Sequence, residues 1–213
     1  MRAGLSRVSA TLFAVVALTS CGSGTGLGTG ASHRTTAAVT GSGGIPRALL
    51  RERRPIGRGP AFSPPARGPV VGSCTRQLGP RDGVHVELFA ANRVVIVAAG
   101  IGTRPPRTFS AGRFSGAGCY GDLVTLEPTG VVLVRRGARA TMSSLFHAWG
   151  QPLSARRLAG FTAPAGSSVE VFVGGRRWSG PPGAVPLARH SEIVLEVGPH
   201  VPPHSSYTFP PGS

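Results

Sequence analysis

Apolar and polar residues alternate along four stretches in the second half of the chain, and this period of two predicts β-strands. Three of the stretches contain a short turn-forming sequence, so each of them predicts a β-hairpin. The hairpins are expected at 84–100 with a turn at Ala91–Asn92, at 122–136 with a turn at Pro128–Gly130, and at 167–180 with a turn at Gly174–Gly175. A last strand is expected at 191–198.

One segment has the period of a helix instead. Its apolar residues fall at positions i, i+3, i+4 and i+7, which form one face of a two-turn helix: Met142, Leu145, Phe146 and Trp149. Thr141 is placed to cap the first turn, and Gly150 followed by Pro152 ends the helix. We therefore expect a short amphipathic helix at about 141–149, with its apolar face in the core.

The N-terminus combines a positively charged start, an apolar run and a cysteine. Two arginines within residues 1–7 precede a mostly apolar run at 8–18, which is too short to span a bilayer. The run ends in Leu18-Thr19-Ser20-Cys21, which resembles a lipobox. In lipoproteins of this type the cysteine thiol carries a diacylglyceryl group, whose two acyl chains hold the protein on the membrane. The resemblance implies cleavage after Ser20, lipidation of Cys21 and a location on the outer face of the bacterial cytoplasmic membrane.

Between this signal and the strands lies a segment with the composition of a linker. Glycine, serine and threonine dominate its first part, and proline and arginine its second. We therefore divide the chain into a signal peptide at 1–20, a flexible tether at 21–70 and a domain at 71–213 that ends in a proline-rich tail.

The expected domain is of the α+β class, made mostly of antiparallel β-hairpins with one short helix over a face of the sheet. Cys74 and Cys119 are its cysteines. An even pair in an exported domain favours a disulfide, which would close a loop of about 45 residues and contribute about 4 kcal/mol in the chain-entropy model. Two free thiols are the alternative.

The charge of the chain is strongly positive, because 23 basic residues, all of them arginine, face 8 acidic ones. A nucleic-acid-binding protein is one interpretation. The other is a GC-rich genome, whose codons favour arginine and also explain the 32 glycines and 20 prolines. No aromatic residue is interleaved with the arginine cluster at 51–58, so bases have no stacking platform there, and we expect no specific nucleic-acid partner. The cluster could instead lie on anionic lipid or another anionic envelope polymer.

Five segments of the domain form a series of motifs: HVELFAANRVVIVAAGIG (85–102), CYGDLVTLEPTGVVLV (119–134), LFHAWGQPLS (145–154), VEVFVGGRRWSG (169–180) and ARHSEIVLEVG (188–198). The most specific parts are Ala-Gly-Ile-Gly at 99–102 and Trp-Gly-Gln-Pro-Leu at 149–153. In these segments the chain resembles an uncharacterised family of exported proteins from high-GC bacteria, and the resemblance covers about residues 72–211.

The family's own segments carry clusters of histidine, which imply a divalent-metal site because imidazoles at alternating strand positions converge on one face. In this chain four of those positions hold other residues: Gly83, Val124, Leu126 and Leu133. Only His85 remains, and one histidine cannot hold a metal. The resemblance therefore implies that the site has been lost, and we expect no metal or other cofactor. A new site built from His85, His190 and Glu87 is the alternative.

No known catalytic motif occurs in the chain, neither a Gly-x-Ser-x-Gly elbow nor a His-Glu-x-x-His pair. We therefore expect a non-enzymatic binding or structural domain at the cell envelope, held there by the N-terminal lipid, with a ligand and protein partner that the sequence does not name. Two alternatives stay open: a metal-binding envelope protein that uses His85 and its neighbours, and an electrostatic binder of anionic wall polymer or nucleic acid.

Overall fold

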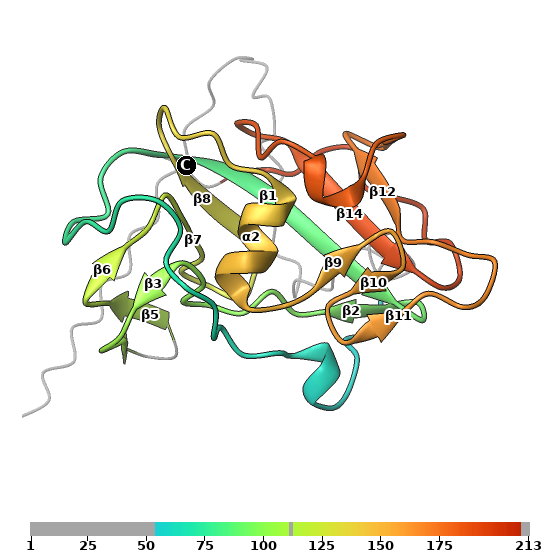
Figure 1. Ribbon diagram of the computed structural model, residues 1–213, viewed down its shortest axis with the longest axis horizontal. Coiled ribbons are helices and arrows are strands. Elements are labelled where there is room, and N and C mark those ends of the chain that lie inside the picture. Colours follow the sequence, from blue (N-terminus) through green and yellow to red (C-terminus); the bar gives the residue numbers. More distant parts are fainter. Residues whose placement is uncertain (1–53, 111–112, 210–213) are drawn as a thin grey trace, which may run out of the picture. The chain divides into compact units, whose positions relative to one another are not determined.

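The computed structural model describes residues 54–110 and 113–209, which form the domain drawn in colour in Figure 1. Leu18, Thr19, Ser20 and Cys21 lie outside the described residues, so the signal and its lipidation stay predictions. Within the described part of the chain, no helix combines the length and the apolar character needed to cross a membrane.

A seven-stranded mixed sheet is the centre of the domain. Its strands are β1 (Arg81–Ala90), β2 (Arg93–Val95), β7 (Leu123–Val124), β8 (Val131–Arg135), β12 (Glu170–Val173), β13 (Arg176–Arg177) and β14 (Glu192–Val197). The order along the sheet is β13-β12-β14-β1-β8-β7, and β2 pairs with β1 outside that path. The long strand β1 runs parallel to β14 and antiparallel to β8 and β2, so it connects both halves of the sheet.

The remaining elements are short. Three small antiparallel sheets are formed by β3 (Thr103–Arg104) with β6 (Cys119–Tyr120), by β4 (Thr108–Ser110) with β5 (Arg113–Gly116), and by β9 (Leu153–Ser154), β10 (Arg157–Leu158) and β11 (Phe161–Thr162). Two single 3-10 turns are η1 (Pro60–Phe62) and η2 (Pro182–Ala184). One α-helix is present among the described residues, α2 (Met142–Trp149).

Helix α2 confirms the element predicted at 141–149. The hydroxyl of Thr141 accepts from the backbone N–H of Ser144, whose own hydroxyl accepts from the N–H of Thr141, which is a complete capping box. Gly150 closes the C-terminus in the left-handed conformation, with a φ of 76°. The four residues of the predicted apolar face are all buried, at 1% exposure or less: Met142, Leu145, Phe146 and Trp149.

The main core lies between α2 and one face of the sheet (Figure 1). Because side chains alternate along a strand, every second residue of β1 and β14 points into this core. These residues are Val84, Val86, Leu88 and Ala90 of β1 and Ile193, Leu195 and Val197 of β14. The other residues of the same two strands are also buried or nearly so, which means that the second face of the sheet is covered as well.

The predicted hairpins are confirmed. Strands β1 and β2 turn at Ala91 and Asn92, with φ of 48° and 60°, as a two-residue hairpin requires. Strands β7 and β8 form the second hairpin and β12 and β13 the third. The central sheet is mixed rather than wholly antiparallel, and the domain is richer in strand than the α+β expectation implied.

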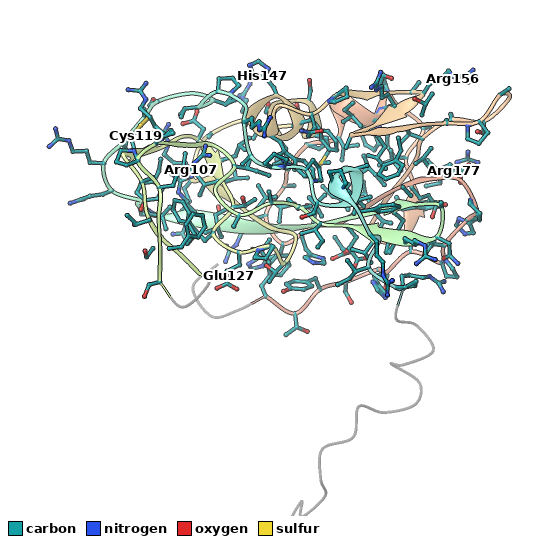
Figure 2. The ribbon with its side chains drawn as sticks, turned by 90° about the horizontal axis from the view of Figure 1, so that it is seen from below. Arg107, Cys119, Glu127, His147, Arg156 and Arg177 are labelled. Atoms are coloured by element: carbon teal, nitrogen blue, oxygen red, sulfur yellow. A yellow bond between two sulfur atoms is a disulfide. The ribbon has the colours of Figure 1, made fainter. Side chains whose placement is uncertain are left out.

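The disulfide between Cys74 and Cys119 is present, with the two Cα atoms 5.4 Å apart. It joins the segment that precedes β1 to β6, and Figure 2 marks its position at Cys119. The structure therefore favours the disulfide over the alternative of two free thiols.

The end of the segment assigned to the tether packs against the domain. Phe62 and Ala66 contact the main core, and the ring of Phe62 lies 4.6 Å from that of Phe161. The indole N–H of Trp149 donates to the carbonyl of Pro64 over 3.0 Å. Proline-rich composition suggested a spacer, but a few apolar residues are enough to hold such a chain on a surface that offers complementary side chains.

Candidate functional site

The face of the sheet opposite α2 carries the polar strand residues, and the C-terminal tail (residues 199–209) covers it, so we call it the tail face. In Figure 2 the tail runs below the sheet in pale red, while α2, marked by His147, lies above it. The strand register places on this face His85, Glu87 and Phe89 of β1, Glu192, Val194 and Glu196 of β14, and Glu170 and Phe172 of β12. The face thus gathers four glutamates in a chain that has only 8 acidic residues.

His85 is the buried histidine of this face, with 6% of its surface exposed. Its Nε2 lies 3.0 Å from the carbonyl oxygen of Thr129, and its Nδ1 lies 2.7 Å from Oε2 of Glu192. A carbonyl only accepts, so Nε2 must carry a hydrogen and donate it. One further proton is then shared between Nδ1 and the Glu192 carboxyl group, and its loss leaves a lone pair on Nδ1 facing a carboxylate. Histidine ligands of metals are commonly held in this way, with one nitrogen donating to a carbonyl and the other free to coordinate.

The turn after β7 fixes the orientation of His85. Gly130 has a φ of 83°, and a Cβ added there would lie 2.5 Å from the carbonyl oxygen of Val86 and 3.1 Å from Nε2 of His85. Only glycine allows the turn to approach β1 so closely. The predicted turn residues therefore have a second role, which is to hold the imidazole.

Glu192 is the most unusual group of the site, because it is only 2% exposed and only one of its oxygens is satisfied. Oε2 contacts His85, whereas the buried Oε1 has no hydrogen-bond partner among the residues that the structure describes. Burial raises the pKa of Glu192, the hydrogen bond and charge of His85 oppose this in part, and Glu87 adds to the rise. A buried acceptor without a donor costs free energy, and a cation beside it would remove that cost.

Glu87 completes a convergent set. Its Oε2 lies 2.8 Å from Nδ1 of His204, which belongs to the tail. One ligand atom each of His85, Glu87 and Glu192 lie within 4.8 Å of one another. Although the chain is rich in arginine, the ion pairs of Glu87 and Glu192 within the described residues are made with histidine, not with arginine. No guanidinium of the described residues therefore balances the charge of these two carboxylates.

A cavity of about 320 Å³ opens beside two members of this set, His85 and Glu87. Its other walls include the Pro128–Gly130 turn, residues Val94–Val97 and Ile56 from the preceding segment. A hydrated ion could therefore reach His85 and Glu87 from this side, whereas Glu192 does not line the cavity.

A second group of possible ligands on the tail face is already occupied. Glu196 receives Nδ1 of His200 and, over 2.8 Å, the backbone N–H of Val201, so both of its oxygens have partners. Glu170 pairs with Arg177 at 2.5 Å. Although Glu170, Glu196 and His200 lie close together, their contacts serve to fix the tail and the hairpin rather than to leave a ligand site.

The structure separates the residues that the sequence proposed for a new site. His85 and Glu87 come together, but His190 is not part of either possible ligand group among the described residues, and its ring stacks on Phe209 at 4.8 Å. Glu192 takes the third place. Neither Glu192 nor His204 was anticipated, because the first looks like an ordinary strand glutamate and the second lies in a proline-rich tail.

Three of the four positions at which the resembled family has histidine lie on the same face of the sheet as His85. Gly83 pairs with Leu133, and Leu133 pairs with Val124, so all three are on the tail face. They carry apolar side chains or none, so a metal here could only be held by the residues on the other side of His85. No family model, curated protein or solved structure matches this chain, and the resemblance therefore stays a prediction.

Proposed function

We propose that this chain is an exported, lipid-anchored protein of the bacterial cell envelope whose domain binds one divalent transition-metal ion through His85, Glu87 and Glu192. The role is binding. The N-terminal signal supports the location, and the convergent set on the tail face supports the ligand.

The observation that carries the proposal is the buried, unpartnered Oε1 of Glu192 beside His85. A structural ion pair would not need a second buried oxygen without a donor. Stable buried carboxylates normally have all their lone pairs satisfied. A metal ion accepts electron density from Oε1, from Nδ1 of His85 and from Glu87 at once.

The ligand types indicate which metals are suitable. Imidazole nitrogen favours zinc and its first-row neighbours, whereas calcium and magnesium prefer oxygen ligands alone. Zinc accepts one nitrogen and two carboxylate oxygens at about 2.0–2.2 Å, and the Nε2–H contact to Thr129 is the outer contact expected for a ligating imidazole. Binding must release the proton shared by His85 and Glu192, so it weakens as the pH falls.

Isothermal titration of the untagged full chain with zinc in detergent tests the proposal. We expect one zinc per chain in the wild type, and loss of that binding in His85→Ala. The matched control is His147→Ala, an exposed histidine on the far side of the sheet (Figure 2), which should bind zinc as the wild type does. A wild type that binds no stoichiometric zinc, or a His85→Ala variant that binds it unchanged, would contradict the assignment.

The location is tested separately through Cys21. A Cys21→Ala chain expressed in a bacterial host should leave the membrane fraction or keep its signal uncleaved, because the thiol is the attachment point for lipid. If the variant is processed and membrane-bound like the parent chain, the lipoprotein part of the proposal is wrong, whereas the zinc site is unaffected.

A further inference from the structure

The C-terminal tail returns across the sheet immediately after β14. Gly198 makes the turn with a φ of 106°. Val201, which is 2% exposed, then packs with Phe89, Phe172 and Val194 on the tail face. Glu196 holds this first part of the tail through His200 and the N–H of Val201. The beginning of the tail is therefore anchored without any help from the metal site.

The second part of the tail lies directly over the site. His204 reaches Glu87 through Nδ1 at 2.8 Å, although nearly half of its side chain is exposed. The ring of Tyr207 stacks on the imidazole of His85, with centroids 3.7 Å apart and planes inclined by 12°. Phe209 then stacks on His190. Beside the stacked rings, the His204–Glu87 contact is a polar link between this part of the tail and the strands.

The three strand ligands leave one position open, because zinc in proteins is usually four-coordinate. His204 is the candidate for that position, because its Nδ1 already contacts one of the carboxylates that would bind the ion. A metal on Glu87 would lie within reach of that nitrogen after a small movement of an exposed side chain. The imidazole would exchange a hydrogen bond to Glu87 for a bond to the metal.

We infer that His204 is the fourth metal ligand and that metal binding fastens residues 203–209 over the site, an inference that rests on the proposed function. The site is then composite: three ligands come from the sheet and one from the tail. Tyr207 covers His85 in the closed arrangement and keeps water from that side of the ion. Without the metal, the His204–Glu87 contact is a half-exposed pair of the kind that contributes little to stability.

Two measurements on the untagged full chain test this inference. The first is zinc affinity in His204→Ala, which should fall roughly 10- to 100-fold while one zinc still binds, because loss of a ligand costs at least as much as loss of an outer-shell partner. The matched control is His200→Ala, a tail histidine only four residues away whose partner is Glu196, and its zinc affinity should change by less than about threefold.

The second measurement follows the tail itself. Limited chymotrypsin digestion should cut after Tyr207, and zinc should slow that cleavage in the wild type and in His200→Ala but not in His204→Ala. Equal zinc affinity in His204→Ala and the wild type, or cleavage at Tyr207 that zinc does not slow, would overturn the inference and leave the three-ligand site standing. A wild type without stoichiometric zinc would overturn both proposals.

Discussion

Replacing Glu192 by glutamine should stabilise the metal-free domain at neutral pH, even though it removes a charge from a salt-bridged pair. Glu192 is 2% exposed, its Oε1 has no donor, and burial raises its pKa. Glutamine has the same shape and no charge. Its amide can donate to Nδ1 of a neutral His85 while Nε2 still donates to Thr129, so that contact keeps a hydrogen bond.

The sign of the pH dependence follows from the direction of the pKa shift. The pKa of Glu192 is about 4.3 in the unfolded chain and higher in the folded one. At a pH between these two pKa values, the folded state binds more protons than the unfolded state. The free energy of unfolding of the wild type therefore falls as the pH rises through that window. The groups facing Glu192 are His85 and Glu87 on β1 and His204 on the tail, and these residues do not change in the variant. In the glutamine variant, the free energy of unfolding should lack the part of this pH dependence that comes from Glu192.

The size of the gain is limited by His85. An unsatisfied buried acceptor costs about 1–3 kcal/mol, and more when it is charged, whereas the contact with His85 returns part of that cost. We expect a gain on the order of 1–2 kcal/mol at pH 7.5 and none near pH 4. For a domain of this size that corresponds to an increase in Tm of about 2–8 °C.

Thermal unfolding followed by circular dichroism, in EDTA at several pH values, measures this gain. The matched control is Glu170→Gln on the same face, which loses a half-exposed pair with Arg177 and should gain nothing. With saturating zinc the wild type should be the more stable of the two, because only the wild type retains the Glu192 carboxylate as a zinc ligand. A Glu192→Gln variant that is less stable than the wild type in EDTA at pH 7.5 would refute the reasoning, since the buried pair would then be stabilising by itself.

Three further changes probe the scaffold. Replacing Cys74 and Cys119 by serine should lower the free energy of unfolding by about 4 kcal/mol, because the loop they close spans 45 residues, and an unchanged denaturant midpoint would contradict this. Phe146→Ala, at a residue 1% exposed, should cost about 3–5 kcal/mol in the same denaturation assay, and a loss below about 1 kcal/mol would show that the helix is not packed as described. Gly130→Ala should cost more than about 1 kcal/mol at a φ of 83° and also weaken zinc binding by displacing His85, so wild-type zinc affinity would count against the role of this turn.

The local elements could be predicted from sequence because their determinants are local. A Thr141 cap, a 3.6-residue apolar period and a terminal Gly150 define α2 within ten residues. The turn at Ala91–Asn92 likewise defines its hairpin. The disulfide followed from cysteine number and expected export. In each case a few adjacent residues, or a simple count, carry the information.

The parallel pairing of β1 with β14 could not be predicted in this way. It joins His85 to Glu192 across more than one hundred residues, and no alternation within either strand specifies the partner. The site depends on this pairing, because Glu192 reaches His85 only through it. Alternation of polar and apolar residues in both strands indicates one buried and one solvated face, so it gave no sign that Glu192 is buried.

The contacts that the tail makes with the sheet could not be predicted from its composition. Proline-rich segments are commonly spacers, and His200 and His204 had no periodic context to give them a role. Their function depends on which side of the sheet the chain crosses after Gly198, and tertiary contacts determine this.

An anomalous difference map, collected at the zinc edge from crystals of the zinc-loaded protein, tests the central claim most directly. We expect one strong peak per chain on the tail face, about 2.0–2.2 Å from Nδ1 of His85 and from a carboxylate oxygen of both Glu87 and Glu192. A map with no peak there, or with zinc bound only elsewhere, would contradict the proposal that His85, Glu87 and Glu192 bind a metal ion.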